Sequence, residues 1–220
     1  MLNVIFDVDG TLVDSFDVDA ACYSQAVEEV LGPVKFRRDW GDYTHVTDTG
    51  ILAEIYQDNA IPPKEDSSAA VRTRFGELIV AALKSQPCAP VPDAIPTMQE
   101  LQGRPDVAVG VATGGWSHTA RAKVHAAGFD ASEWILASSD DHAERAEIMR
   151  TCLAQLPQPG APTVYIGDGE WDQRACAQLG WAFVGIGARL KGKTASWVAD
   201  YVSCDFDQAL QAALASQRGS

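Results

Sequence analysis

The sequence LNVIFDVDGTLVDS occupies residues 2–15, and the other segments are interpreted outward from it. Its first part, Leu2 to Phe6, is a short apolar run of the kind that forms a buried strand. Asp7 and Asp9 follow at once, so we expect both at the C-terminal end of that strand, with Gly10 allowing a tight turn. Two carboxylates there would repel each other without a cation between them, and a hard cation such as Mg²⁺ fits this need. An Asp-Gly pair by itself is usually only a turn.

The segment from Phe16 to about Gln86 has a helix-like composition, with Ala, Glu and Leu in helical register and no clear strand. Ser15 is expected to cap its first helix. Outside this segment strand and helix alternate, which predicts an α/β fold: a three-layer, doubly wound, Rossmann-like parallel sheet with helices on both faces. We therefore predict a core domain of residues 1–14 and 90–220 and an inserted helical domain of residues 15–89.

Two later apolar strands also end in polar residues. Thr113 and Gly114 follow the first of them, and Asp168 follows the second. Open parallel sheets bind their ligands at the C-terminal ends of their strands. Asp172 lies one helical turn after Asp168, so we expect it to point back toward the same site.

Together these segments resemble the sequence motifs of the haloacid dehalogenase superfamily, and they occur in the same order. The motifs are Asp7-Val8-Asp9-Gly10-Thr11 for DxDGT, Thr113 after an apolar strand, Arg145 where the family has lysine or less often arginine, and Gly167 to Asp172 for GDxxxD. The inserted helices are similar to the small helical cap of one phosphatase-like branch, that of phosphoglycolate phosphatase and beta-phosphoglucomutase. We call residues 15–89 the cap. The resemblance covers nearly the whole chain.

The resemblance implies roles for the carboxylates. Asp7 is expected to be the nucleophile that becomes an aspartyl-phosphate, and Asp9 the general acid and base. Mg²⁺ is expected to bind the carboxylates of Asp7 and Asp168 and the backbone carbonyl of Asp9. Asp172 would orient a metal-bound water or hold Arg145 in place.

The resemblance also implies a set of phosphate contacts. Thr113, the backbone at Gly114 and Arg145 are expected to hold the transferred phosphoryl group, the first through its neutral hydroxyl. The alternative for Arg145 is an ion pair with Asp141 or Glu144 on a solvated helix face, which would contribute little.

In the cap, Thr44-His45-Val46-Thr47-Asp48 resembles a loop that many family members write as GRTD, with Val46 in place of the arginine. His45 either replaces that arginine as a substrate contact or is a surface loop histidine. Arg37 and Arg38 are the alternative cationic contacts, with surface charge as their ordinary role.

The function implied by the resemblance is magnesium-dependent hydrolysis of a small phosphorylated metabolite, a phosphomonoester. One alternative is a sugar-phosphate mutase, which shares the four core motifs and differs in cap residues that exclude water. The other, from a different class, is a phosphoacceptor signalling domain of the receiver type, against which the cap and Asp9 argue. Dehalogenases of the superfamily lack an acid at the position of Asp9.

Composition excludes several classes of partner. The 220 residues carry a formal net charge of −13 without a cluster of Lys or Arg, so we expect no nucleic acid as partner. No apolar run reaches the ~20 residues that a membrane span needs, so we expect no membrane either. The five cysteines are far apart and suit reduced thiols, and no leader precedes the first strand, so we expect a cytoplasmic protein. We expect it to be a monomer or a homodimer. Its expected partner is a small-molecule phosphate ester.

Overall fold

The computed structural model describes residues 1–202 and 205–218. These residues form a six-stranded sheet in the order β5-β4-β1-β6-β7-β8, in which all neighbouring strands are parallel. The strands are β1 (Leu2–Phe6), β4 (Val107–Ala112), β5 (Leu136–Ala137), β6 (Thr163–Gly167), β7 (Ala182–Ile186) and β8 (Trp197–Val198). β1 lies between β4 and β6, which explains why it is apolar on both faces.

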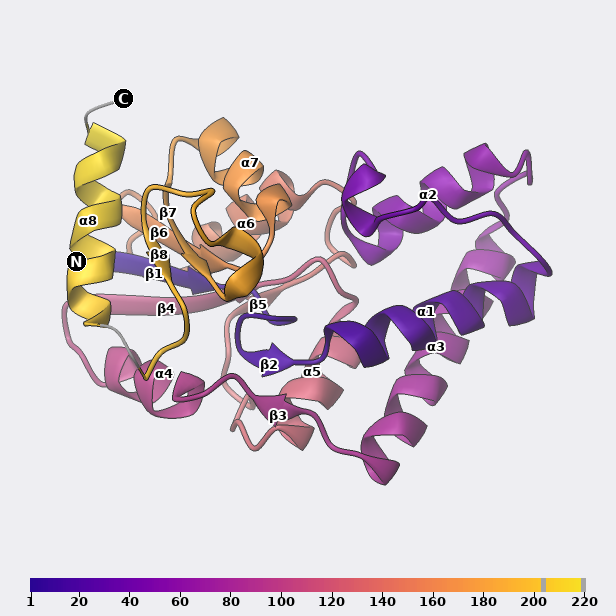
Figure 1. Cartoon of the computed structure of the whole chain (residues 1–220), viewed down its shortest axis with the longest axis horizontal. Coiled ribbons are helices and arrows are strands. Elements are labelled where there is room, and N and C mark those ends of the chain that lie inside the picture. The colour runs from indigo at the N-terminus through magenta and orange to yellow at the C-terminus, as the bar shows by residue number, and fades with distance from the viewer. Residues whose placement is uncertain (203–204, 219–220) are drawn as a thin grey trace.

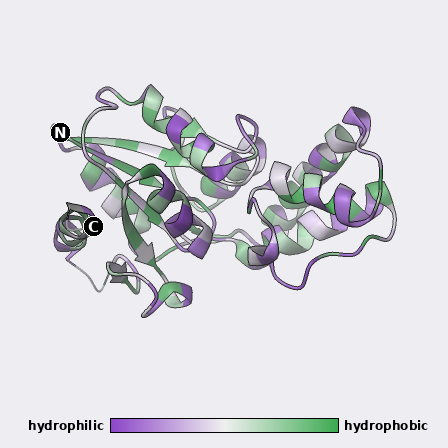
Figure 2. Cartoon of the chain, turned by 90° about the horizontal axis from the view of Figure 1, so that it is seen from above, coloured by the Kyte–Doolittle hydropathy of each residue, from purple (hydrophilic) through white to green (hydrophobic). Residues whose placement is uncertain are grey.

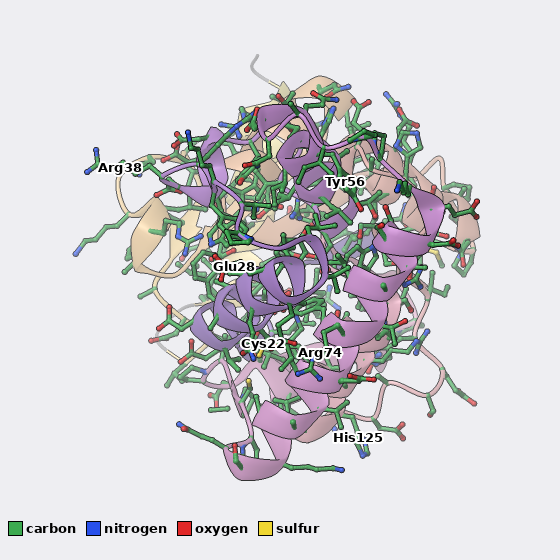
Figure 3. The ribbon with its side chains drawn as sticks, turned by 90° about the vertical axis from the view of Figure 1, so that its right-hand side faces the viewer. Cys22, Glu28, Arg38, Tyr56, Arg74 and His125 are labelled. Carbon is green, nitrogen blue, oxygen red and sulfur yellow. The ribbon has the colours of Figure 1, made fainter. Side chains whose placement is uncertain are left out.

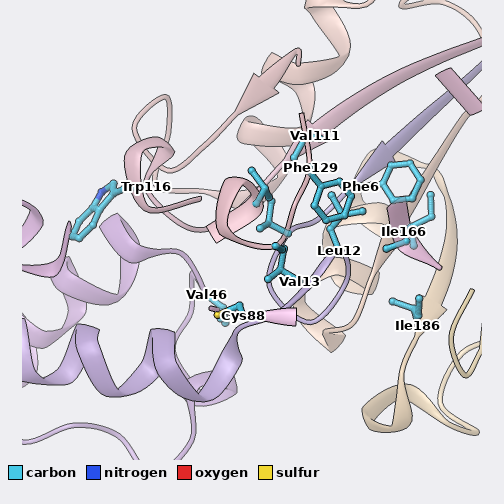
Figure 4. Packing of buried hydrophobic residues seen from close by; sticks show 14 of the residues in the cluster. Phe6, Leu12, Val13, Val46, Cys88, Val111, Trp116, Phe129, Ile166 and Ile186 are labelled. Atoms are coloured by element: carbon cyan, nitrogen blue, oxygen red, sulfur yellow. The ribbon is translucent and has the colours of Figure 1, made fainter. Parts of the chain in front are cut away.

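Helices cover both faces of this sheet. Val4 and Phe6 pack in one hydrophobic cluster with residues of α4 (Ala94–Gln102), α5 (Ser117–Ala126) and α8 (Phe206–Arg218). Ile5, between them in the sequence, points to the other cluster, with α6 (Arg145–Gln155) and α7 (Glu170–Leu179). Figure 4 shows Phe6 beside Ile166 of the neighbouring strand in the first cluster. The predicted three-layer, doubly wound α/β fold is confirmed.

The cap helices lie beyond the C-terminal end of β1, away from the sheet (Figures 1 and 2). They are α1 (Phe16–Leu31), the 3₁₀ turn η1 (Trp40–Asp42), α2 (Asp48–Asp58) and α3 (Glu65–Ser85). The two chain segments that join them to the sheet pair with each other as the antiparallel strands β2 (Val13–Asp14) and β3 (Ala89–Pro90). This arrangement is consistent with an inserted helical cap, and the exact domain boundaries stay a prediction.

Ser15 corrects one expectation. It immediately precedes α1, but its side chain makes no capping hydrogen bond; its Oγ donates instead to Asp9 Oδ1 at 2.5 Å. A carboxylate is a stronger acceptor than a neutral group, and the turn after Asp9 brings it within reach of this hydroxyl. The strands β2 and β3 were not predicted, because two residues are too few to show a hydrophobic period.

The state of the cysteines and the character of the helices can be read from the described residues. Cys22, Cys88, Cys152 and Cys176 are buried free thiols, whereas Cys204 lies outside the described residues. Among residues 1–202 and 205–218, no helix combines the length and the apolar character that crossing a membrane requires.

Candidate active site

Three buried carboxylates meet at the C-terminal ends of β1 and β6. Asp7 directly follows β1, Asp168 follows β6, and Asp172 lies in the first turn of α7. One carboxylate oxygen from each lies within 4.8 Å of the others. Gly10 makes this approach possible: it has φ +75°, and a Cβ at this position would lie 2.3 Å from Asp168 Oδ2. The crossover topology therefore joins carboxylates that are about 160 residues apart in the sequence.

The electrostatics of these carboxylates suit a hard divalent cation. Burial, aided by the neighbouring acids, raises the pKa of Asp7 to about 7 and that of Asp168 to about 7 against the attraction of Arg145. Asp7 Oδ1 is buried and has no hydrogen-bond partner among the described residues. An unsatisfied carboxylate oxygen beside a second carboxylate is a donor set that Mg²⁺ prefers. The residues present therefore fit the expected metal.

Arg145 opens α6 and lies inside this cluster, with 8% of its surface exposed. Its Nη1 donates to Asp172 Oδ1 at 2.8 Å and lies 3.4 Å from Asp7 Oδ2, while its Nη2 donates to the carbonyl of Val46 at 2.8 Å. Burial opposes the charge, but Asp172 and Asp7 raise the pKa of the guanidinium well above its usual value. The alternative of a solvated surface ion pair is therefore wrong for Arg145.

Thr113 and Gly114 follow β4, the strand next to β1, and line the same cavity as Asp7, which is described below. The backbone N–H of Gly115 donates to Thr113 Oγ1 at 3.1 Å, which orients the hydroxyl. A Cβ on Gly114 would lie 2.3 Å from Arg145 Nη2 and 2.8 Å from the carbonyl of Val46. Gly114 thus leaves room for the contact between Arg145 and the cap, a role that its sequence motif did not indicate.

Asp9 is held on the other side of the site by a residue that the sequence analysis did not identify. Lys123 of α5 is fully buried, and its Nζ lies 2.6 Å from Asp9 Oδ1 and also pairs with Asp19 of α1. Burial opposes its charge, yet Asp19 and Asp9 raise the pKa of Lys123 well above its usual value. The sequence does indicate that Lys123 is buried, because this lysine lies on the same face of its helix as the apolar residues Ala120 and Val124.

The N-terminus of α2 places a further buried acid, Asp48, against the core domain. Thr47 caps the helix by accepting the N–H of Gly50, and its hydroxyl donates to the carbonyl of Ala143 at 2.6 Å. Asp48 Oδ2 accepts the backbone N–H of Trp116 at 2.8 Å. Burial, with Asp19 the largest of the charges nearby, raises the pKa of Asp48 well above its usual value. The sequence analysis gave Thr47 and Asp48 only as part of the loop that resembles GRTD and assigned them no contact with the core domain.

A cavity of about 80 Å³ separates the cap from the core domain. The core side contributes Asp7, Asp9, Thr113, Gly114, Arg145 and Asp168, and the cap side contributes the acids Asp19 and Asp48 with the rings of Phe16, Tyr23 and Trp40. Six of the eight residues predicted for the site therefore line this cavity.

The other two predicted side chains, and the alternative cationic contacts, lie elsewhere. Asp172 lies behind Arg145, fully buried, and His45 of the cap loop does not line the cavity. Arg37 pairs with Glu54 and Asp58 on the cap surface. Figure 3 shows Arg38 pointing away from the molecule.

The comparison with solved structures shows the fold. Beta-phosphoglucomutase from Clostridium difficile is similar with a TM-score of 0.76 at 14% identity, covering 100% of this chain and 100% of that one. CbbY from Rhodobacter sphaeroides, in complex with xylulose-(1,5)bisphosphate, has a TM-score of 0.71 at 18% identity, covering 92% and 96%. A predicted phosphoglycolate phosphatase from Haemophilus somnus has a TM-score of 0.61 at 18% identity, covering 94% and 97%.

The sequence comparisons place the chain in a family. No curated protein matches it significantly. A family model described as haloacid dehalogenase-like hydrolase matches residues 1–180, which include all four motifs and every carboxylate of the cavity. The chain belongs to the haloacid dehalogenase-like hydrolases.

Proposed function

We propose that this protein hydrolyses a small phosphomonoester in two steps, through an aspartyl-phosphate on Asp7. The observation that carries the proposal is the position of Asp7: it is buried at the floor of the cavity, with one carboxylate oxygen free of hydrogen bonds and Arg145 beside the other. A carboxylate with one unpaired oxygen and a guanidinium beside it is poised to attack a phosphorus atom whose oxygens Arg145 can bind.

In the first step, a carboxylate oxygen of Asp7 forms a bond to phosphorus while the bond from phosphorus to the alcohol oxygen breaks. Asp9 lines the same cavity and gives a proton to the leaving oxygen. In the second step, Asp9 takes a proton from a solvent water as the oxygen of that water bonds to phosphorus, and the bond between Asp7 and phosphorus breaks. Asp9 thus regains the proton it gave, and phosphate and the free alcohol leave.

Arg145 and Thr113 hold the transferred group in this scheme. The guanidinium offers a planar set of donors that matches phosphoryl oxygens, and Asp172 fixes its orientation from behind at 2.8 Å. Asp7 and Asp168 would hold Mg²⁺, with the backbone carbonyl of Asp9 as a further ligand, and the ion supplies positive charge that offsets repulsion between the nucleophile and the phosphate.

The mutase alternative needs a second anion site, because a mutase binds a sugar carrying two phosphates during its cycle. The cap contributes no Lys, Arg or His to the described lining of the cavity. Arg37 is already paired with two carboxylates, and Arg38 points to solvent (Figure 3). The absence of a cation on the described cap side of the cavity favours hydrolysis over mutase activity.

The test is a rapid-quench experiment on p-nitrophenyl phosphate with Mg²⁺. We expect nitrophenolate release, an acid-stable but hydroxylamine-labile phosphate on the wild-type protein, and neither in Asp7→Asn, which keeps the size of the side chain but removes the nucleophilic charge. Asp66→Asn, an exposed acid of the cap, is the matched control and should behave as wild type. Hydrolysis that persists in Asp7→Asn, or in EDTA, would overturn the proposal.

A further inference from the structure

The part of the cavity where α1 and α2 of the cap meet the core domain holds more negative than positive groups. Three carboxylates, those of Asp9, Asp19 and Asp48, gather around the single ammonium of Lys123. Lys123 is fully buried and is hydrogen-bonded to Asp9 and Asp19, so its positive charge is already paired with these two carboxylates. Asp48 is the carboxylate left without a cationic partner among the described residues.

Asp48 is 7% exposed and lines the cavity. Its Oδ2 accepts the N–H of Trp116, whereas its Oδ1 has no donor among the residues that the structure describes. A buried carboxylate without a partner is costly, and a cation that binds beside it recovers that cost. Asp48 Oδ1 can therefore accept a hydrogen bond from a ligand, or pair with a positive charge of a ligand, on the cap side of the cavity.

The protein itself supplies no such group nearby. Arg145 is the one Lys or Arg among the described lining residues, and it is bonded to Asp172 and to the cap backbone. Arg189 lies on the side of Asp168, 3.5 Å from its Oδ2. Neither of these cations pairs with Asp48, and the nearby Lys123 is already bonded to Asp9 and Asp19, so a cation of the ligand can supply the partner that Asp48 lacks.

Aromatic rings complete the cap wall. Tyr23 and Trp40 line the cavity together with Phe16, and the face of an aromatic ring attracts cations. The Arg189 guanidinium already lies over the Phe16 ring, 4.2 Å from its centroid. An acid next to aromatic rings is the combination that binds organic ammonium groups, whereas it repels a second phosphate or a carboxylate.

We infer that the alcohol part of the substrate carries an ammonium group, so that the substrate is a phosphomonoester of a short amino alcohol. This rests on the proposed function, because Asp7 and Asp9 mark where the phosphate and the leaving oxygen bind. A Cβ on Gly115 would lie 3.7 Å from Asp9 Oδ2 and 3.8 Å from Asp48 Oδ2, so the two carboxylates flank one point. Because these two carboxylates lie close together, an ammonium group beside Asp48 is only a few bonds from a leaving oxygen beside Asp9.

The experiment compares phosphocholine with 3,3-dimethylbutyl phosphate, which has the same shape but carbon in place of the charged nitrogen. We expect kcat/KM for phosphocholine to exceed that for the neutral ester by ~10-fold or more, as a desolvated cation beside rings and a carboxylate implies. In Asp48→Asn, which keeps the acceptor for the Trp116 N–H, this ratio should fall toward one. Asp66→Asn, exposed on the same cap, should keep the wild-type ratio.

A ratio near one in the wild-type protein, or a ratio unchanged in Asp48→Asn, overturns the inference even if p-nitrophenyl phosphate is hydrolysed. If no ester is hydrolysed, the proposed function fails, and calorimetric binding of the same two esters decides the inference alone. Tighter binding of phosphocholine that depends on Asp48 supports it; equal binding of the two esters overturns it. Thermal melting of Asp48→Asn identifies loss of folding, in which case Trp40→Leu provides the second measurement of the ratio.

Discussion

The two halves of the cavity are built alike but from different parts of the chain. On the core side, Arg145 lies among Asp7, Asp168 and Asp172; on the cap side, Lys123 lies among three other carboxylates. Each half contains one buried cation and several acids; the acids around Arg145 are all buried, whereas of those around Lys123 only Asp48 is buried.

The difference lies in which elements meet. The core-side acids come from β1, β6 and α7, which the sheet holds together. The cap-side group joins Lys123 of α5 to Asp19 of α1, so it spans core and cap. A rigid sheet suits groups whose spacing must be accurate, whereas the ion pairs of Lys123 link the position of α1 in the cap to Asp9 in the core domain.

The largest expected effect is on the core side, in Arg145→Ala. Removing the donor that faces Asp7 should lower kcat/KM by on the order of 10²- to 10³-fold, and Arg145→Lys should lose only part of the activity because an ammonium lacks the planar fork. Steady-state kinetics at saturating Mg²⁺ check this. Arg150→Ala, an exposed arginine of the same helix, is the control. Arg145→Ala within a few-fold of wild type would remove this residue from the phosphoryl site.

The largest expected effect on the cap side is on stability, in Lys123→Met. The change leaves Asp9 and Asp19 without their shared partner, and breaking a buried ion pair costs about 3 to 5 kcal/mol. Urea unfolding of the variant measures this loss, with Lys84→Met on exposed α3 as control. Adding Asp19→Asn should recover part of the stability. A loss no larger than that of the control would show that the cluster does not hold cap and core together.

The third prediction concerns pH in the metal-free protein. Asp7 and Asp168 have folded pKa values of about 7, raised from 3.8, so the folded state binds protons more tightly than the unfolded state. Stability should therefore fall as the pH rises from about 4 to about 7. Melting temperatures in EDTA between pH 5 and pH 8 measure this fall, and added Mg²⁺ should raise the melting temperature more at pH 8 than at pH 5. A metal-free protein that is equally stable at both pH values would contradict the assignment of these two acids.

The smallest expected effect is in Arg38→Ala. This exposed side chain points away from the cavity (Figure 3), so the KM for p-nitrophenyl phosphate should stay within about twofold of wild type, as expected for an isolated surface charge. A several-fold rise in KM would mean that the cap does contribute a cation to the site, and it would weaken the contrast between the two halves.

Much of the core side could be predicted from the sequence because each of its residues directly follows a strand or opens a helix. The apolar run Leu2 to Phe6 placed Asp7 at a strand end, and the run before Asp168 did the same for that acid. In an open parallel sheet, residues that directly follow the strands lie at the same edge of the sheet, independently of the length of the connecting loops. Arg145 could be located but not interpreted, because its burial depends on Asp172, on the cap carbonyl of Val46 and on the space left by Gly114.

The cap side could not be predicted in the same way. Lys123, Asp19 and Asp48 lie on three helices, and apart from the apolar neighbours of Lys123 on its helix face, their local sequence does not show that they are more than helix-surface charges. The sequence by itself determined the layered fold and the acids at the strand ends, since these depend on local apolar patterns. Only the tertiary structure decided which charges became buried partners, because burial of a charge depends on how α1, α2 and α5 meet across the cavity.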